Sequence, residues 1–168
     1  MPSKNVSSAD NQQERLRNEG WVIGFVDGEG CFSVSIIKNA TTKFGWQVFP
    51  EFVVTQGDKS KSSLYILNDF FGCGRIFVNN RYDNHKENIY RYCVRSKVEL
   101  SEKIIPFFEK NQLKTAKKGD FKIFSKIIAM MNENEHQEFS GIKKIAKLIE
   151  KMNHKKSSRF LKSSETKR

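Results

Sequence analysis

The chain has 168 residues, and its 30 lysines and arginines against 19 aspartates and glutamates give a formal net charge of +11 at pH 7. A hydrophobic fraction of 38%, including 14 phenylalanines, is enough for one packed domain and excludes an acidic disordered chain. Three cysteines without short paired spacings exclude a disulfide scaffold or a zinc ribbon, and no segment approaches the roughly 20 apolar residues of a membrane span. So strong a positive charge favours a polyanionic partner such as nucleic acid.

The first half of the chain predicts a helix, a hairpin and a second helix. Residues 1–11 are polar and are expected to form a flexible leader. Apolar spacing predicts a helix over residues 14–26, which ends at the glycines of positions 28 and 30. Alternating apolar and polar residues predict paired strands over 31–39 and 46–56, and a helical stripe follows over 61–71.

The second half predicts two more strands, over 75–81 and 88–95, and three amphipathic helices, over 98–110, 117–131 and 139–152. The order αββαββααα predicts a single α+β domain over residues 12–154. Its antiparallel sheet would carry helices on one face and leave the other face free for a partner. Residues 155–168 are expected to form a basic tail, in which Phe160 and Leu161 could dock on the domain.

The predicted first helix carries a stripe of small residues. Gly24 and Gly28 are four residues apart on one helical face, and Trp21 lies three residues before Gly24. An interior helical glycine costs about 0.5–1 kcal/mol relative to alanine, so the pair calls for a packing reason. The stripe therefore predicts close approach of a second helix at Trp21, Gly24 and Gly28.

Two acids follow that stripe at the end of the helix. Asp27 and Glu29 fall where the unpaired carbonyls and the negative end of the helix dipole disfavour carboxylates, and a cation would relieve that repulsion. The Glu29 carboxylate and the Gly28 carbonyl offer the oxygen ligands that Mg²⁺ takes. A glycine-terminated helix with two solvated acids is the alternative interpretation.

Residues 22–30, VIGFVDGEG, resemble the nine-residue signature of the LAGLIDADG homing endonucleases. Similar segments of that family match VVTQ at 53–56, GCG at 72–74, IPFF at 105–108 and LKTAKKGDF at 113–121, so the resemblance covers roughly residues 18–152. It implies an αββαββα core with a saddle-shaped antiparallel sheet on double-stranded DNA. The signature occurs once, which implies a homodimer with the signature helix on the two-fold axis.

The resemblance also implies roles for individual residues. Glu29 and Gly28 would bind the divalent cation, Mg²⁺, which lowers the pKa of a bound water for hydrolysis of each DNA strand. Asp27 would orient the helix end, and Gln56 would position water or phosphate. The implied basic active-site residue is Lys114 or Lys117, with Lys118, Lys59 and Lys61 as further candidates.

Strand alternation predicts the DNA-facing side of the sheet. Arginine can pair with guanine, and asparagine or glutamine with adenine, in a major groove wide enough for a β-ribbon. The residues expected to face DNA are Ser33, Ser35, Ile37, Asn39, Gln47, Thr55, Arg75, Phe77, Asn79, Arg81, Arg91, Cys93 and Arg95. Phe49 and Glu51 share their alternation and break the basic character of the face, so the register of the second strand needs testing.

These patterns predict a site-specific homing endonuclease that makes a metal-dependent double-strand cut in a long, partly palindromic DNA site. A maturase of the same fold that binds its host intron RNA is one alternative, and a DNA-binding protein without cleavage is another; retention of Glu29 favours cutting. Abundant lysine, asparagine, isoleucine and phenylalanine suit an AT-rich genome. Because the family is often encoded in organellar introns, we expect synthesis inside a chloroplast or mitochondrion.

Overall fold

The computed structural model describes residues 8–80, 87–152 and 160–161. Its element order agrees with the predicted αββαββ followed by helices. The elements are α1 (Ser8–Glu29), β1 (Gly30–Lys38), β2 (Trp46–Gly57), η1 (Asp58–Ser60), α2 (Ser62–Phe71), β3 (Arg75–Asn79), β4 (Ile89–Val94), α3 (Lys97–Glu99), η2 (Leu100–Ile104), α4 (Ile105–Lys110), α5 (Lys117–Asn132), η3 (Glu135–Gln137) and α6 (Phe139–Ile149). Among the described helices, none has the length and apolar character needed to cross a bilayer.

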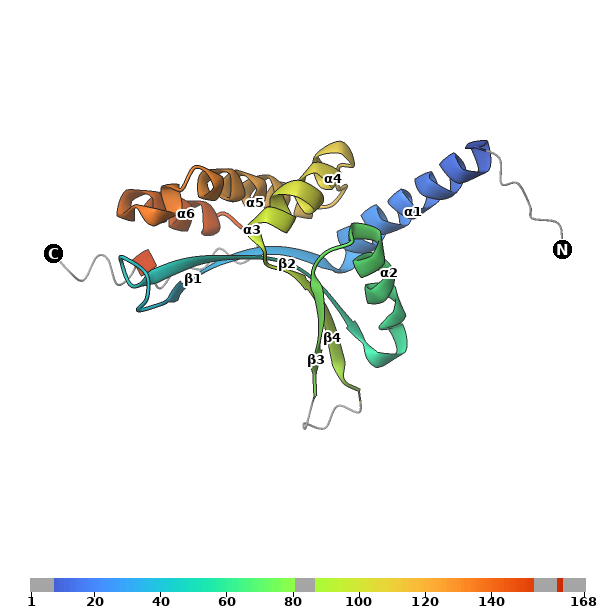
Figure 1. Cartoon of the computed structure of the whole chain (residues 1–168), viewed down its shortest axis with the longest axis horizontal. Coiled ribbons are helices and arrows are strands. Elements are labelled where there is room, and N and C mark those ends of the chain that lie inside the picture. The colour runs from blue at the N-terminus through green and yellow to red at the C-terminus, as the bar shows by residue number, and fades with distance from the viewer. Residues whose placement is uncertain (1–7, 81–86, 153–159, 162–168) are drawn as a thin grey trace.

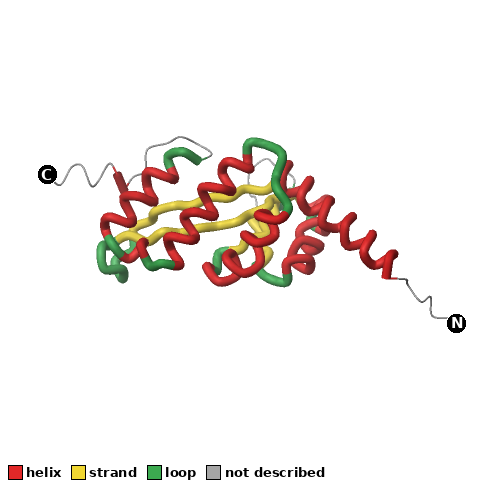
Figure 2. The backbone as a smooth tube through the Cα atoms, turned by 90° about the horizontal axis from the view of Figure 1, so that it is seen from above, coloured by secondary structure: helices red, strands yellow, loops and turns green. Residues whose placement is uncertain are grey.

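The four strands form one antiparallel sheet in the order β1-β2-β4-β3. Figure 1 shows the helices on its convex side, while β3 and β4 bend away and leave the concave underside uncovered. Seen from above in Figure 2, the helices cross over the strands. The predicted saddle-shaped sheet, with helices on one face, is therefore confirmed.

Phenylalanine rings join the sheet to the helices that cover it. Phe32 of β1 stacks on Phe52 of β2 with ring centroids 5.0 Å apart, and it meets Phe108 and Phe121 edge-on at 5.5 and 5.2 Å. Such contacts bury large apolar surfaces in favoured ring geometries. The alternation of buried residues along β1 and β2 thus decides which face of each strand the helices cover.

The register of β2 is the predicted one. Ser33 of β1 lies opposite Glu51, and Thr55 of β2 lies opposite Arg91 of β4. Arg91 in turn lies opposite Phe77 of β3. Residues directly opposite one another share a face, so Glu51 belongs to the uncovered face together with these neighbours.

Helix α1 differs from its prediction at both ends. It begins at Ser8, so residues 8–11, which were expected to belong to the leader, are helical. It also continues to Glu29 and passes directly into β1 at Gly30. Residues 9–18 are all exposed, and a helical segment that buries no face leaves no apolar periodicity in the sequence.

The later helices also depart from the sequence pattern in detail. The helix predicted over 98–110 contains a π-helical stretch, η2, directly before α4. Pro106 is the second residue of α4 and has no N–H to donate, so the regular hydrogen-bond ladder is interrupted there. Phe160 is buried, with its ring 5.4 Å from that of Trp46, so its predicted docking is confirmed. Leu161 is partly buried and packs against the same cluster, and residues 155–159 and 162–168 of the predicted basic tail lie outside the described residues.

Candidate active site and nucleic-acid interface

The junction between α1 and β1 requires glycine at position 30. A Cβ atom there would lie 2.6 Å from Cγ1 of Val26 and 2.7 Å from its carbonyl oxygen. Only a residue without a side chain lets the chain leave the helix at this angle. The junction consequently presents Glu29, the last residue of α1, at the exposed end of the helix.

Asp27 fastens the end of α1 to the segment that precedes α5. Its carboxylate accepts hydrogen bonds from the backbone N–H of Lys114 at 2.7 Å, from that of Thr115 at 3.1 Å, and from the Thr115 hydroxyl at 2.5 Å. Desolvation opposes ionisation, yet these hydrogen bonds and the charge of Lys117 hold the pKa of Asp27 below its ordinary value. The interpretation of two solvated acids is therefore wrong for Asp27, which holds the start of α5 in place.

Lys117 places its ammonium group on the last carbonyls of α1. Its Nζ atom donates to the carbonyl oxygen of Gly28 at 2.6 Å and to that of Asp27 at 2.8 Å. A cation at the carboxyl end of a helix is stabilised by the helix dipole. Lys114 contributes only its backbone N–H to this network, and among the described residues its side chain makes no hydrogen bond there. The geometry thus distinguishes Lys117 from Lys114.

The other basic candidates lie apart from this network. Lys59 forms an ion pair with Glu87 at 3.1 Å, and Lys61 forms one with Asp58 at 2.9 Å. Gln56 lies opposite Tyr90, in alternation with the buried Val54, and within the described residues no hydrogen bond joins it to Glu29 or Lys117. The role expected for Gln56 stays a prediction.

The glycine stripe of α1 is open surface. A Cβ added at Gly24 or Gly28 would meet no atom within 4 Å in this chain. Trp21 is 39% exposed, and its ring stacks on that of Phe25 with centroids 5.0 Å apart. The surface predicted for a second helix is thus flat, partly aromatic and not covered by any described residue of its own chain.

Most of the predicted DNA-facing side chains lie on the uncovered concave face. The exposed ones are Ser35, Ile37, Thr55, Arg75, Phe77, Asn79 and Arg95, and Ser33 and Arg91 are partly exposed. Cys93 shares this face but is only 3% exposed, so its predicted contact with DNA is wrong because the thiol has almost no surface to offer. Asn39 donates to Gln47 Oε1 at 2.8 Å, and both hold the turn between β1 and β2. Arg81 lies outside the described residues.

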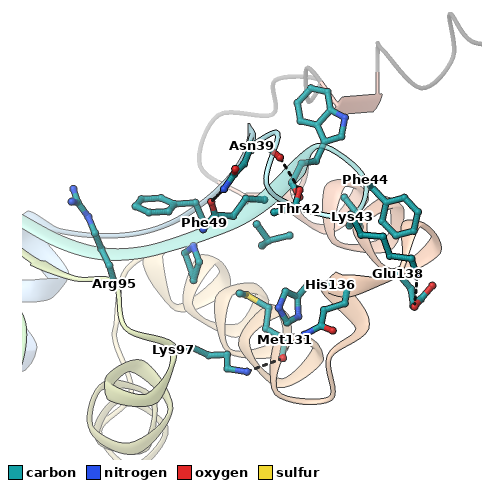
Figure 3. Close-up of a pocket in the computed structure, with 16 residues that line it drawn as sticks. Asn39, Thr42, Lys43, Phe44, Phe49, Arg95, Lys97, Met131, His136 and Glu138 are labelled. Atoms are coloured by element: carbon teal, nitrogen blue, oxygen red, sulfur yellow. Dashed lines mark hydrogen bonds and ion pairs between the residues drawn. The ribbon is translucent and has the colours of Figure 1, made fainter.

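Sequence reasoning missed the partners of Glu51. This carboxylate accepts from Arg91 Nη2 at 2.9 Å and from Arg95 Nε at 2.5 Å. Figure 3 shows Arg95 and Phe49 across the β2 ribbon from Met131 and His136, and all four side chains line a cavity of about 630 Å³. The available signal was a single acid on a predicted sheet face whose other charged residues are arginines; the structure shows that the acid pairs with two of them and that the register of β2 is not shifted.

The sequence was compared with known families. Residues 22–128 match the model of the LAGLIDADG endonuclease. This chain belongs to the LAGLIDADG endonuclease family. The match begins in the second half of α1 and ends in α5, so it includes the helix junction, the whole sheet and the segment that Asp27 fastens.

Individual LAGLIDADG relatives cover most of the chain. The probable intron-encoded endonuclease 2 of Neurospora crassa is 36% identical over 130 residues, which are 76% of this chain and 27% of the relative. DNA endonuclease I-CeuI of Chlamydomonas moewusii is 29% identical over 136 residues, 79% of this chain and 61% of the relative. This chain therefore spans about a quarter of the Neurospora protein and less than two thirds of the Chlamydomonas protein.

Solved LAGLIDADG structures share the fold. The crystal structure of the homing endonuclease I-TnaI aligns with a TM-score of 0.77 and 41% identity, covering 89% of this chain and 97% of that one. I-SmaMI bound to uncleaved DNA target in the presence of calcium ions aligns with a TM-score of 0.78 and 33% identity, covering 89% of this chain and 49% of that one. This chain thus covers nearly all of the first structure and about half of the second.

The residues at the end of α1 offer the type of ligand atom, oxygen, that a hard divalent cation prefers. The Glu29 carboxylate and the Gly28 carbonyl are adjacent oxygen donors, and the Lys117 contact shows that a positive charge is stabilised at that carbonyl. The described part of the chain holds no cluster of three or more His, Cys, Asp or Glu residues. Since Mg²⁺ requires near-octahedral coordination, two protein ligands leave room for water, phosphate oxygens or a ligand from a second copy.

Proposed function

We propose that this chain is a site-specific homing endonuclease that hydrolyses both strands of a DNA site with the help of Mg²⁺. The observation that carries the proposal is the junction of α1 with β1. There an exposed Glu29 follows the Gly28 carbonyl, which accepts the Lys117 ammonium at 2.6 Å. The adjoining concave sheet face carries arginines and no helix.

Each group at the junction has a distinct task. Glu29 and the Gly28 carbonyl would hold the cation, which would lower the pKa of the attacking water and neutralise charge on the leaving oxygen. The Lys117 ammonium occupies that carbonyl in the present structure, and it would turn to a phosphate oxygen when the cation takes its place there. Asp27 keeps Lys117 in position through its hydrogen bonds to Lys114 and Thr115.

The working enzyme is, in this proposal, a homodimer. One chain supplies one Glu29, whereas a double-strand cut needs attack at two phosphates. The stripe of Trp21, Gly24 and Gly28 offers a flat helical surface for a second copy. Two copies of this chain would have about the length of I-SmaMI, of which one copy covers 49%. A closed two-fold dimer would recognise a partly palindromic site.

The intron-encoded origin named for the Neurospora relative supports the same origin for this chain. We propose that it is encoded in an intron of an organelle genome. Sequencing the DNA on both sides of the reading frame would test this, because exon sequence of an organellar gene should flank it. Nuclear flanking sequence would contradict the proposal.

The catalytic assignment is tested by Glu29→Gln, which keeps the size of the side chain and removes its charge. Sites would first be selected from a randomised DNA library cleaved by the wild type with Mg²⁺. On a selected site, the variant should lose cleavage while its DNA affinity stays within about tenfold, because phosphate and base contacts elsewhere supply most of the affinity.

Glu14→Gln is the matched control for this experiment. It makes the same chemical change at an exposed position of α1, fifteen residues before the junction. The control should cut at the wild-type rate. Cleavage by Glu29→Gln at a rate near that of the control would refute the assignment of Glu29 as a metal ligand.

A further inference from the structure

An acidic side chain occupies the middle of the basic sheet face. Glu51 lies opposite Ser33 of β1, and its side chain is 11% exposed. Its two carboxylate oxygens each accept one hydrogen bond, from Arg91 at 2.9 Å and from Arg95 at 2.5 Å. Three charged groups therefore carry a net charge of only +1. A carboxylate here weakens attraction to phosphates, so its place on this face calls for a compensating role.

Arg95 is held on three sides. Its Nε–H is bound to Glu51, and its guanidinium lies 5.5 Å from the ring centroid of Phe49 and 5.0 Å from that of Phe77. Planar stacking on aromatic rings is a favoured geometry for guanidinium groups. The plane and direction of the Arg95 head are consequently fixed before any DNA arrives.

The part of Arg95 that remains available is its terminal edge. An arginine has five N–H donors, and the single one on Nε is already used by Glu51. The two Nη groups form the fork that pairs with O6 and N7 of guanine. By contrast, Arg75 of β3 is exposed and has no hydrogen bond to another described residue. The two arginines share a face but differ in how far they are constrained.

We propose that Glu51 is a positioning residue for base recognition: it holds Arg95, with Arg91 beside it, so that the free edge of Arg95 meets a guanine instead of a phosphate. The inference rests on the proposed function, since it assumes that the concave face binds DNA. Fixing a side chain in its bound direction lowers the entropic cost of binding. Withholding two positive charges from the phosphates also reduces binding to unrelated sequences, which is a gain in specificity.

The test compares the wild type with Glu51→Gln and with Glu133→Gln. Glu133 is exposed at the end of α5, so its variant makes the same charge change away from the sheet face. Binding would be measured to the selected site, to all its single-base variants and to random DNA over a range of salt concentrations. The helical content and thermal melting of each protein would be recorded alongside.

In Glu51→Gln, preference for guanine should fall about tenfold or more at one base pair in each half-site. Affinity for random DNA at low salt should rise at the same time. The slope of log K against log salt should become steeper by about 0.9 for each arginine that now reaches a phosphate. Glu133→Gln should leave the base preferences at their wild-type values.

Each contrary result has a definite meaning. If the wild type selects no cleaved site, the proposed function fails and this inference fails with it. If the wild type cuts but Glu51→Gln keeps the base preferences, or weakens all variants equally, Glu51 only supports the sheet and the inference alone is overturned. If Glu51→Gln does not melt cooperatively, the test is made instead with Phe77→Leu, which removes one of the aromatic rings that hold the Arg95 guanidinium in place. Phe77 is 42% exposed, so this variant should fold, and unchanged guanine preference in it would overturn the inference.

Discussion

The glycine stripe of α1 makes a prediction in which stability and assembly change in opposite directions. Gly24 lies inside α1, and a Cβ atom there would meet nothing within 4 Å in the single chain. Replacing an unpacked interior glycine with leucine should stabilise the isolated fold by about 0.8–1 kcal/mol, the difference in helix propensity. For a chain of this length, that corresponds to a rise in Tm of about 2–4 °C.

In the proposed homodimer the same leucine side chain would stand between two helices. Gly24→Leu should therefore abolish the dimer and double-strand cleavage although its monomer is at least as stable as that of the wild type. Sedimentation at several protein concentrations would report the assembly. Melting at the same concentrations would show a Tm that rises with concentration for the wild type but not for Gly24→Leu.

Gly119→Leu is the control for folding and assembly. Gly119 is an exposed helical position in α5 where an added Cβ would also meet nothing within 4 Å, but it lies outside the stripe. This variant should gain stability and remain dimeric. A Gly24→Leu protein that sediments as a dimer and cuts both strands would refute the interface, and one whose monomer melts well below the wild type would refute the stability argument.

Three further outcomes follow from the geometry. The hydrogen bonds that Asp27 accepts lower its pKa in the folded protein. They therefore stabilise the native state at pH values above the ordinary pKa of 3.8, and this stabilisation is lost as the pH falls through the lowered pKa. In urea unfolding from pH 5 to 2, the free energy of unfolding should decline less for Asp27→Asn than for the wild type. Gly30→Ala should lower the free energy of unfolding by about 1–3 kcal/mol, measured in urea, since its Cβ would lie 2.6 Å from Val26 Cγ1. Arg75→Ala should cost about 1–3 kcal/mol at one base pair in each half-site of a single-base binding profile, whereas Lys147→Ala, at an exposed position of α6, should weaken all sequences alike or have no effect.

The sequence predicted the elements that bury one face and, within α1, missed only residues 8–13, which belong to a segment that buries none. Strands β1 and β2 begin or end within one residue of their predicted limits, because Phe32 and Phe52 belong to strict alternations that only one register satisfies. The first three turns of α1 are polar and exposed, so no periodicity marked their beginning at Ser8. Local patterns report burial, and a protruding helix has little burial to report.

Contacts between distant segments were beyond the reach of such patterns. Asp27 meets Lys114 and Thr115, which are 87 and 88 residues further along the chain. Glu51 meets Arg91 and Arg95 at separations of 40 and 44 residues. A single sequence shows that an acid stands in an unfavourable place, but the fold alone shows which donor compensates it.

That distinction also supports the proposed cation site at Glu29. Three acids occupy unfavourable places. The helix dipole disfavours the carboxylates of Asp27 and Glu29, and Glu51 lies on the sheet face that is proposed to bind DNA phosphates. Asp27 is satisfied by two backbone N–H groups and a hydroxyl, and Glu51 by two guanidinium groups. Glu29 alone of the three is exposed and receives no hydrogen bond from another described residue. A carboxylate that the chain positions through a glycine junction but does not neutralise is suited to bind a metal ion.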